Sequence, residues 1–171
     1  MTDKYLRELW ERSLNVASIS FVLASSFTEL DANTAMLAGL IHAIGMPPIL
    51  LRAEDEPDLL DDEQALDALL YSLYPRIGVA ILESWDFPPE LVAVAGEHTD
   101  LFRDADGPAD YVDVVMAALL QAVAGSDHWL ANQDLSSVSA FRRLGIEADM
   151  EMINVEGTAE DMDEVKQLLA G

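Results

Sequence analysis

Residues 33–45, Asn-Thr-Ala-Met-Leu-Ala-Gly-Leu-Ile-His-Ala-Ile-Gly, place one histidine in a segment with almost no other polar side chain. From Met36 to Ile44 every residue except His42 is apolar or glycine, so the pattern predicts a buried helix rather than an amphipathic surface helix. Ala38 and Gly39 share the face of His42 and leave room there for a close neighbour. The histidine is therefore expected to be either a metal ligand or a core residue with a hydrogen-bond partner.

The remainder of the chain also has helical periodicity. Between Lys4 and Phe27, apolar residues recur at spacings of three and four. No stretch of four to eight residues alternates cleanly between apolar and polar, so little or no β structure is expected. The fold class predicted is all-α, a compact multi-helix bundle. Further helices are predicted at 61–70, 75–85, 90–97, 108–124, 137–144 and 158–170.

Several residues predict where helices begin and end. Asp31 is an N-cap candidate for the helix with His42, and Gly45 with Pro47-Pro48 should stop or bend that helix. The acidic segment 52–60 is expected to be a loop, and the spacing of Asp61 and Gln64 predicts a capping box. Thr158 with Asp161 is expected to cap the last helix.

Composition limits the class of protein. A chain of 171 residues, 51% of them hydrophobic, can form a single compact domain over 1–171. It contains no cysteine, which excludes disulfides and thiolate metal sites. The N-terminus lacks the pattern of a signal peptide, and no uninterrupted apolar run approaches the ~18 residues of a membrane span. The expectation is a soluble, cytoplasmic protein.

The charge balance bears on partners. Nine basic and 32 acidic residues give a net charge of −23, which argues against nucleic acid and against anionic membranes. The acidic clusters at 54–63 and 147–164 are interpreted as solvated surface, with a docking surface or adaptation to salt as alternatives.

Four segments together resemble the HDOD domain, the "HD-related output domain" of bacterial signalling proteins. They are 9–17 with Trp10 and Ser13, 33–45 with His42, 75–82 with Gly78, and 97–100 with His98. The wider HD superfamily consists largely of metal-dependent phosphohydrolases. The resemblance implies an all-helical module of signal transduction, mostly without hydrolase activity. HDOD regions typically begin with a further helical half, so the chain is expected to lack that half, and self-association to a homo-oligomer is plausible.

Two positions depart from the catalytic pattern of the superfamily. Its members usually have a His-Asp doublet where this chain has His42-Ala43, and a methyl group cannot ligate a metal. Arg12 lies where catalytic relatives offer a histidine, and its charge would repel a cation. If a metal site exists, its ligands are expected to be His42, His98 and Asp113, with Asp110 as the alternative carboxylate. The other interpretation has His42 buried and hydrogen-bonded, His98 at a helix end and His128 on the surface.

The leading hypothesis is a non-catalytic signalling or regulatory domain that needs no cofactor and binds a protein partner. One alternative is a divergent phosphohydrolase dependent on a divalent metal. A second is a sensor of nucleotides or second messengers, with Trp10, His42, Tyr74 and His98 lining a pocket and Arg12 as a further ligand-binding candidate. Trp10, Trp85 and Trp129 are predicted to be core or groove residues.

Overall fold

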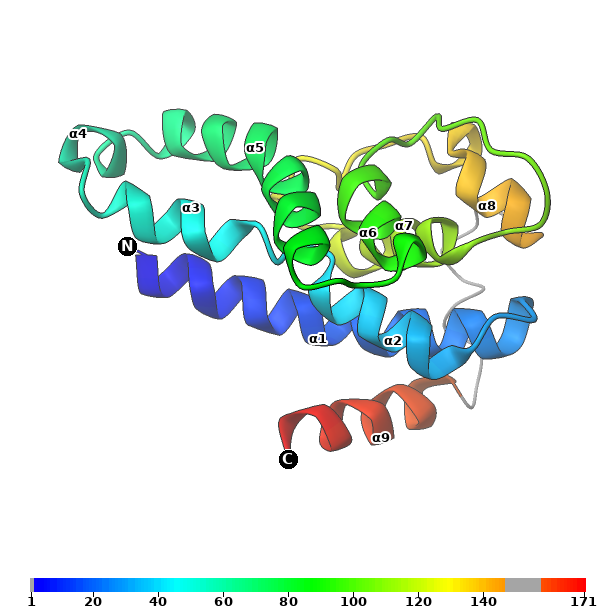
Figure 1. Cartoon of the computed structure of the whole chain (residues 1–171). Coiled ribbons are helices and arrows are strands. Elements are labelled where there is room, and N and C mark those ends of the chain that lie inside the picture. Colours follow the sequence, from blue (N-terminus) through cyan, green and yellow to red (C-terminus); the bar gives the residue numbers. More distant parts are fainter. Residues whose placement is uncertain (1, 147–157) are drawn as a thin grey trace.

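The computed structural model describes residues 2–146 and 158–171, and within these ranges all regular secondary structure is helical, with no strand (Figure 1). The all-α prediction is confirmed. The helices are α1 Thr2–Phe27, α2 Ala32–Ile41, α3 Met46–Ala53, α4 Pro57–Leu60, α5 Glu63–Ser84, α6 Pro89–Glu97, α7 Tyr111–Val123, α8 Ser139–Leu144 and α9 Thr158–Ala170, with a 3-10 turn at Leu135–Ser137.

Among the described helices, α1 and α2 make the most extensive contact. Asp31 caps α2 as predicted, because its carboxylate accepts a hydrogen bond from the Thr34 amide at 2.7 Å. A Cβ at Gly39 would lie 2.9 Å from the Cα of Ala17, so only glycine lets the two backbones approach this closely. This contact holds the C-terminal end of α2, and with it His42, against α1.

The segment from 33 to 45 is not one continuous buried helix. Helix α2 ends at Ile41, His42 is its C-cap, and a turn through Gly45 leads into α3. One face of α2 is buried while Leu37 on another face is 40% exposed. Apolar composition predicted burial all round, but α2 has neighbours on part of its circumference only, so the burial prediction was wrong for this face.

Prolines lie at most of the other differences from the predicted boundaries. Pro47 and Pro48 lie in the first turn of α3, where the helix needs no amide donors. The expected loop at 52–60 contains the end of α3 and the one-turn helix α4, which begins at Pro57. Helix α5 is capped by Asp62 rather than Asp61 and continues through Pro75, where a separate helix had been expected to begin.

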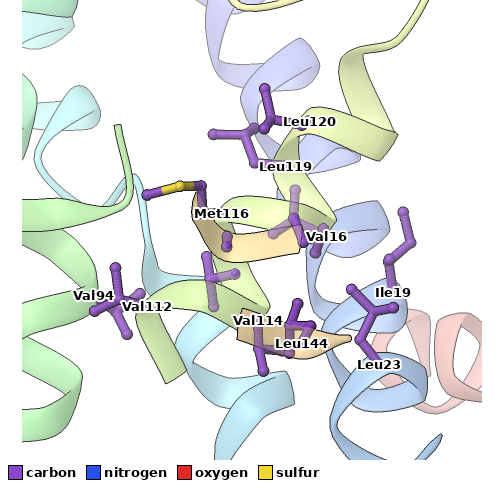
Figure 2. Packing of buried hydrophobic residues seen from close by; sticks show 14 of the residues in the cluster. Val16, Ile19, Leu23, Val94, Val112, Val114, Met116, Leu119, Leu120 and Leu144 are labelled. Carbon is purple, nitrogen blue, oxygen red and sulfur yellow. The ribbon is translucent and has the colours of Figure 1, made fainter. Parts of the chain in front are cut away.

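The large hydrophobic core lies around α7. Ten residues of α7 are buried, and they pack against α1, α6 and α8 (Figure 2). Figure 2 shows Val16, Ile19 and Leu23 of α1 in the same cluster as Val114 and Leu119 of α7 and Leu144 of α8. A second, smaller cluster joins Leu9 of α1, Ala43 of the turn, α3 and α5. His42 lies in the turn that leads into this second cluster.

The C-terminal helix α9 was predicted and is confirmed. It packs against α1, with Val165 buried and Leu168 79% exposed, on the side of α1 away from α5 and α6 (Figure 1). The capping predicted for Thr158 and Asp161 falls on side chains outside the described residues.

By length and composition alone, the stretches 32–53 and 63–84 could cross a membrane, which differs from the expectation of none. Half of the apolar window of the first and 28% of that of the second are buried inside the fold, and the turn at 42–45 breaks the first. Core helices pass the same test, so this is weak evidence for a membrane span.

Candidate functional site: a cleft beside two buried imidazoles

Two histidines that are far apart in sequence meet inside the protein. The rings of His42 and His98 are 5.1 Å apart, centroid to centroid, in an edge-to-face arrangement, and both side chains are buried. Each is the C-cap of a helix, His42 of α2 and His98 of α6. The two helix ends therefore place the imidazoles together.

Hydrogen bonds determine the tautomer of both rings. His42 Nδ1 lies 2.6 Å from the Gly39 carbonyl oxygen, and His98 Nδ1 lies 2.8 Å from that of Val94. Because a carbonyl only accepts, Nδ1 carries the proton in each ring. The Tyr74 hydroxyl, from α5, donates to His98 Nε2 at 2.7 Å, so both nitrogens of His98 are occupied.

Burial keeps both imidazoles neutral. It lowers the pKa of His42 to about 3, with the neighbouring His98 and the positive charge of Arg12 adding to the effect. Burial likewise lowers the pKa of His98 to about 4. At neutral pH the pair is uncharged.

A cleft of about 470 Å³ opens between α1, α3, α5 and the end of α7. Arg12, Tyr71 and His128 line it, and the charge of Arg12 also acts on Tyr74 and His42. The His128 ring is 5.5 Å from that of Tyr71. Burial first, and Arg12 second, lower the pKa of His128 to about 4.

The cleft differs from the pocket expected from the sequence. Arg12 lines it, but Trp10 is 53% exposed and does not, while His42, Tyr74 and His98 are buried and not part of its lining. None of the three tryptophans lies in the core, since Trp85 is 60% and Trp129 45% exposed, and none of them lines this cleft. A tryptophan within a helical pattern does not reveal which face its helix buries.

Two residues of the cleft were not predicted as site residues. His128, expected on the surface, is partly buried against Tyr71, and its Nδ1 accepts a hydrogen bond from the Leu130 amide at 3.2 Å. No periodic signal marks a histidine in a loop. Tyr71 lies one helical turn before Tyr74, which was the only available hint.

The candidate carboxylate Asp113 belongs to a separate ionic network. Its side chain is fully buried and binds Arg143 at 2.8 Å and Arg103 at 3.2 Å. Asp110 pairs with Arg103 and completes a capping box with Asp113 at the start of α7. Among the described residues, Asp113 forms no metal-binding group with the two imidazoles.

The residues around His42 do not fit a divalent metal. Ala43 offers a methyl group, Arg12 a positive charge, and the Nε2 of His98 is taken by Tyr74. Within residues 2–146 and 158–171, no three His, Asp or Glu side chains are grouped so as to hold a metal ion. A metal site would need at least the Tyr74 hydroxyl to move away.

Comparison with solved structures identifies the class of fold. The chain is similar to a protein of Shewanella amazonensis SB2B that is described as a "putative metal-dependent phosphohydrolase", with a TM-score of 0.77 and 24% identity. The similarity covers 98% of this chain and 60% of that protein, so the chain spans 60% of its length. The chain therefore has the same fold as the matching part of the Shewanella protein.

The family model of the HDOD domain matches residues 1–101 of the chain. The chain belongs to the HDOD family. No curated protein matches it.

Proposed function

We propose that this protein is a non-catalytic, cytoplasmic signalling or regulatory domain that acts by binding another protein. The observation that carries the proposal is the environment of His42. The methyl group of Ala43 and the guanidinium of Arg12 stand where a metal would need a carboxylate and an imidazole as ligands. Burial already keeps the His42 imidazole neutral without a metal.

The buried polar groups support a structural role for the imidazole pair. His42 is satisfied by the Gly39 carbonyl, and His98 by the Val94 carbonyl and the Tyr74 hydroxyl. The Tyr74–His98 bond links α5 to α6, and the contact between the two imidazole rings joins the end of α2 to the end of α6. The histidines therefore contribute to the fold without any reaction.

Exposed aromatic side chains support a protein partner. Trp85 is 60% and Phe102 69% exposed, and the Trp85 ring lies 6.4 Å from that of Phe87. Phe87 and Pro89 also line a second cavity, of about 330 Å³, with Glu83 and Asp86. Exposed aromatic residues are enriched at protein interfaces, where they bury much area at low entropic cost.

Turnover measurements test the non-catalytic part. Protein stripped of metal and reloaded with Mn²⁺, Mg²⁺, Fe²⁺ or Zn²⁺ is expected to hydrolyse neither cyclic dinucleotides nor a model phosphodiester, and elemental analysis is expected to find substoichiometric metal. The matched control is His42→Ala. Turnover in the wild type that this variant abolishes would support the phosphohydrolase alternative and end the proposal.

A further inference from the structure

Arg12 is a cation without a carboxylate partner. Although the chain has 32 acidic residues, no Asp or Glu oxygen of the described residues lies within 4 Å of its guanidinium. Lys4 lines the same cleft and lies 3.9 Å from both Glu8 and Glu63. The Tyr71 hydroxyl is its hydrogen-bond partner, which leaves further N–H donors of the guanidinium. A partly buried guanidinium without a carboxylate partner is a receptor for an anion.

The remaining charge of the cleft restricts this anion. Its lining includes five carboxylates, Glu8, Glu11, Glu63, Asp67 and Asp127. Such a lining repels a doubly charged phosphate, whereas one carboxylate can form two parallel hydrogen bonds with the guanidinium. The anionic group that fits is therefore a single carboxylate.

Some of the lining carboxylates are also free to bind a cation. Glu8 and Glu63 lie close to Lys4, and Asp67 accepts a hydrogen bond from the Tyr5 hydroxyl at 2.8 Å. Glu11 and Asp127 have no cationic side chain within 4 Å among the residues that the structure describes. They can accept an ammonium group from a ligand.

The wall between these charges is apolar. It is formed by Leu9, Met46, Leu50, Leu70 and Val123. The volume of about 470 Å³ lies within the range of small-molecule sites.

We propose that the cleft binds a small zwitterion, a free apolar α-amino acid. Arg12 binds the carboxylate, Glu11 and Asp127 bind the ammonium, and Leu50 and Leu70 contact the side chain. The binding site adds a small-molecule input to the domain and does not depend on whether the domain binds a protein.

Isothermal titration calorimetry with L-leucine, L-methionine and L-phenylalanine tests the proposal on the full chain. At least one of the three is expected to bind. Its amide lacks the carboxylate and its deaminated acid lacks the ammonium group, so each analogue is expected to bind at least about tenfold more weakly. No heat with any of the three at millimolar concentration would overturn the proposal, as would tighter binding of inorganic phosphate.

Variants identify the residues that bind the ligand. Arg12→Met is expected to weaken binding about tenfold or more, with partial recovery in Arg12→Lys. Arg7→Met removes an exposed arginine of the same helix that does not line the cleft, and it should bind as the wild type does. Equal affinity of Arg12→Met and the wild type would refute the assignment.

A second pair of variants keeps the test decisive if Arg12→Met does not fold. Glu11→Gln with Asp127→Asn should weaken binding of the amino acid and leave binding of the deaminated acid unchanged or stronger. Unchanged affinity for the amino acid in this double variant would also overturn the proposal.

Discussion

Three histidines of one chain take on different properties because their surroundings differ. His42 and His98 are buried and hydrogen-bonded to carbonyls at helix ends, whereas His128 lies partly buried in a loop beside Tyr71. In the unfolded chain all three have a pKa of about 6.5. Folding lowers each pKa, to about 3 for His42 and about 4 for the other two.

This lowering predicts that acid weakens the contribution of the histidines to stability. Below pH 6.5 the histidines of the unfolded chain bind protons, whereas the folded imidazoles stay neutral. The stability that is present above pH 6.5 is therefore lost as the pH falls toward about 4. The free-energy advantage of the wild type over His98→Gln in urea unfolding is expected to shrink by up to about 2 kcal/mol between pH 7 and pH 5.

The comparison between variants cancels the effect of acid on the many surface carboxylates. Leu82→Ala, a buried substitution without a titratable group, serves as the control, and its difference from the wild type should not change with pH. A constant difference for His98→Gln over the same range would contradict the pKa assigned to His98.

At the scale of elements, α5 and the turn after α2 fit each other through their backbones. Pro75 lies inside α5, where it removes one helical hydrogen bond, and α5 changes direction along its length (Figure 1). Gly45 packs on this part of α5: a Cβ there would lie 2.1 Å from the Tyr74 carbonyl oxygen and 2.6 Å from the Gly78 nitrogen.

Gly45→Ala is therefore expected to destabilise the protein by at least about 2 kcal/mol, because backbone atoms cannot yield to the methyl group as a flexible side chain would. Thermal or urea unfolding measures the change. Gly78→Ala is the matched control across the same contact, since its Cβ would meet Ala95 at an ordinary 3.4 Å. It should be neutral or stabilising by up to about 1 kcal/mol, as alanine favours helix. Equal losses in the two variants would show that the close approach at Gly45 is not what limits this position.

At the scale of the whole molecule, the net charge of −23 opposes folding through self-repulsion. The ion pairs of Lys4 and Arg52 are exposed, whereas the arginines in the network of Arg103, Arg143, Asp110 and Asp113 are largely buried. Salt screens exposed charges far more than buried ones. The main effect of added salt should be to weaken the repulsion between the acidic side chains on the surface.

The melting temperature at pH 7 is therefore expected to rise by about 3–6 °C between low salt and 0.5 M NaCl, on the order of 1–2 kcal/mol for a chain of this size. The same titration at pH 4.5 is the control, because partial protonation of carboxylates reduces the repulsion and should reduce the gain. A melting temperature at pH 7 that stays flat or falls with salt would show that the surface charges are too far apart to matter.

The sequence by itself determined the class of fold and most helices of this protein. Periodicity at three and four residues and Asp31 as a cap are local signals, which local hydrogen bonds and backbone conformation enforce. The resemblance carried by Trp10, His42, Gly78 and His98 likewise predicted the family that the comparison confirms.

Only the tertiary structure decided which side chains meet. The pairing of His42 with His98, the Tyr74 hydroxyl on His98 and the cleft of Arg12, Tyr71 and His128 join segments more than twenty residues apart. The exposure of Trp10 and the ion pairs of Asp113 depend equally on which helix packs on which. Neither spacing nor composition contains this information, because packing between distant elements, rather than local conformation, determines burial and contact.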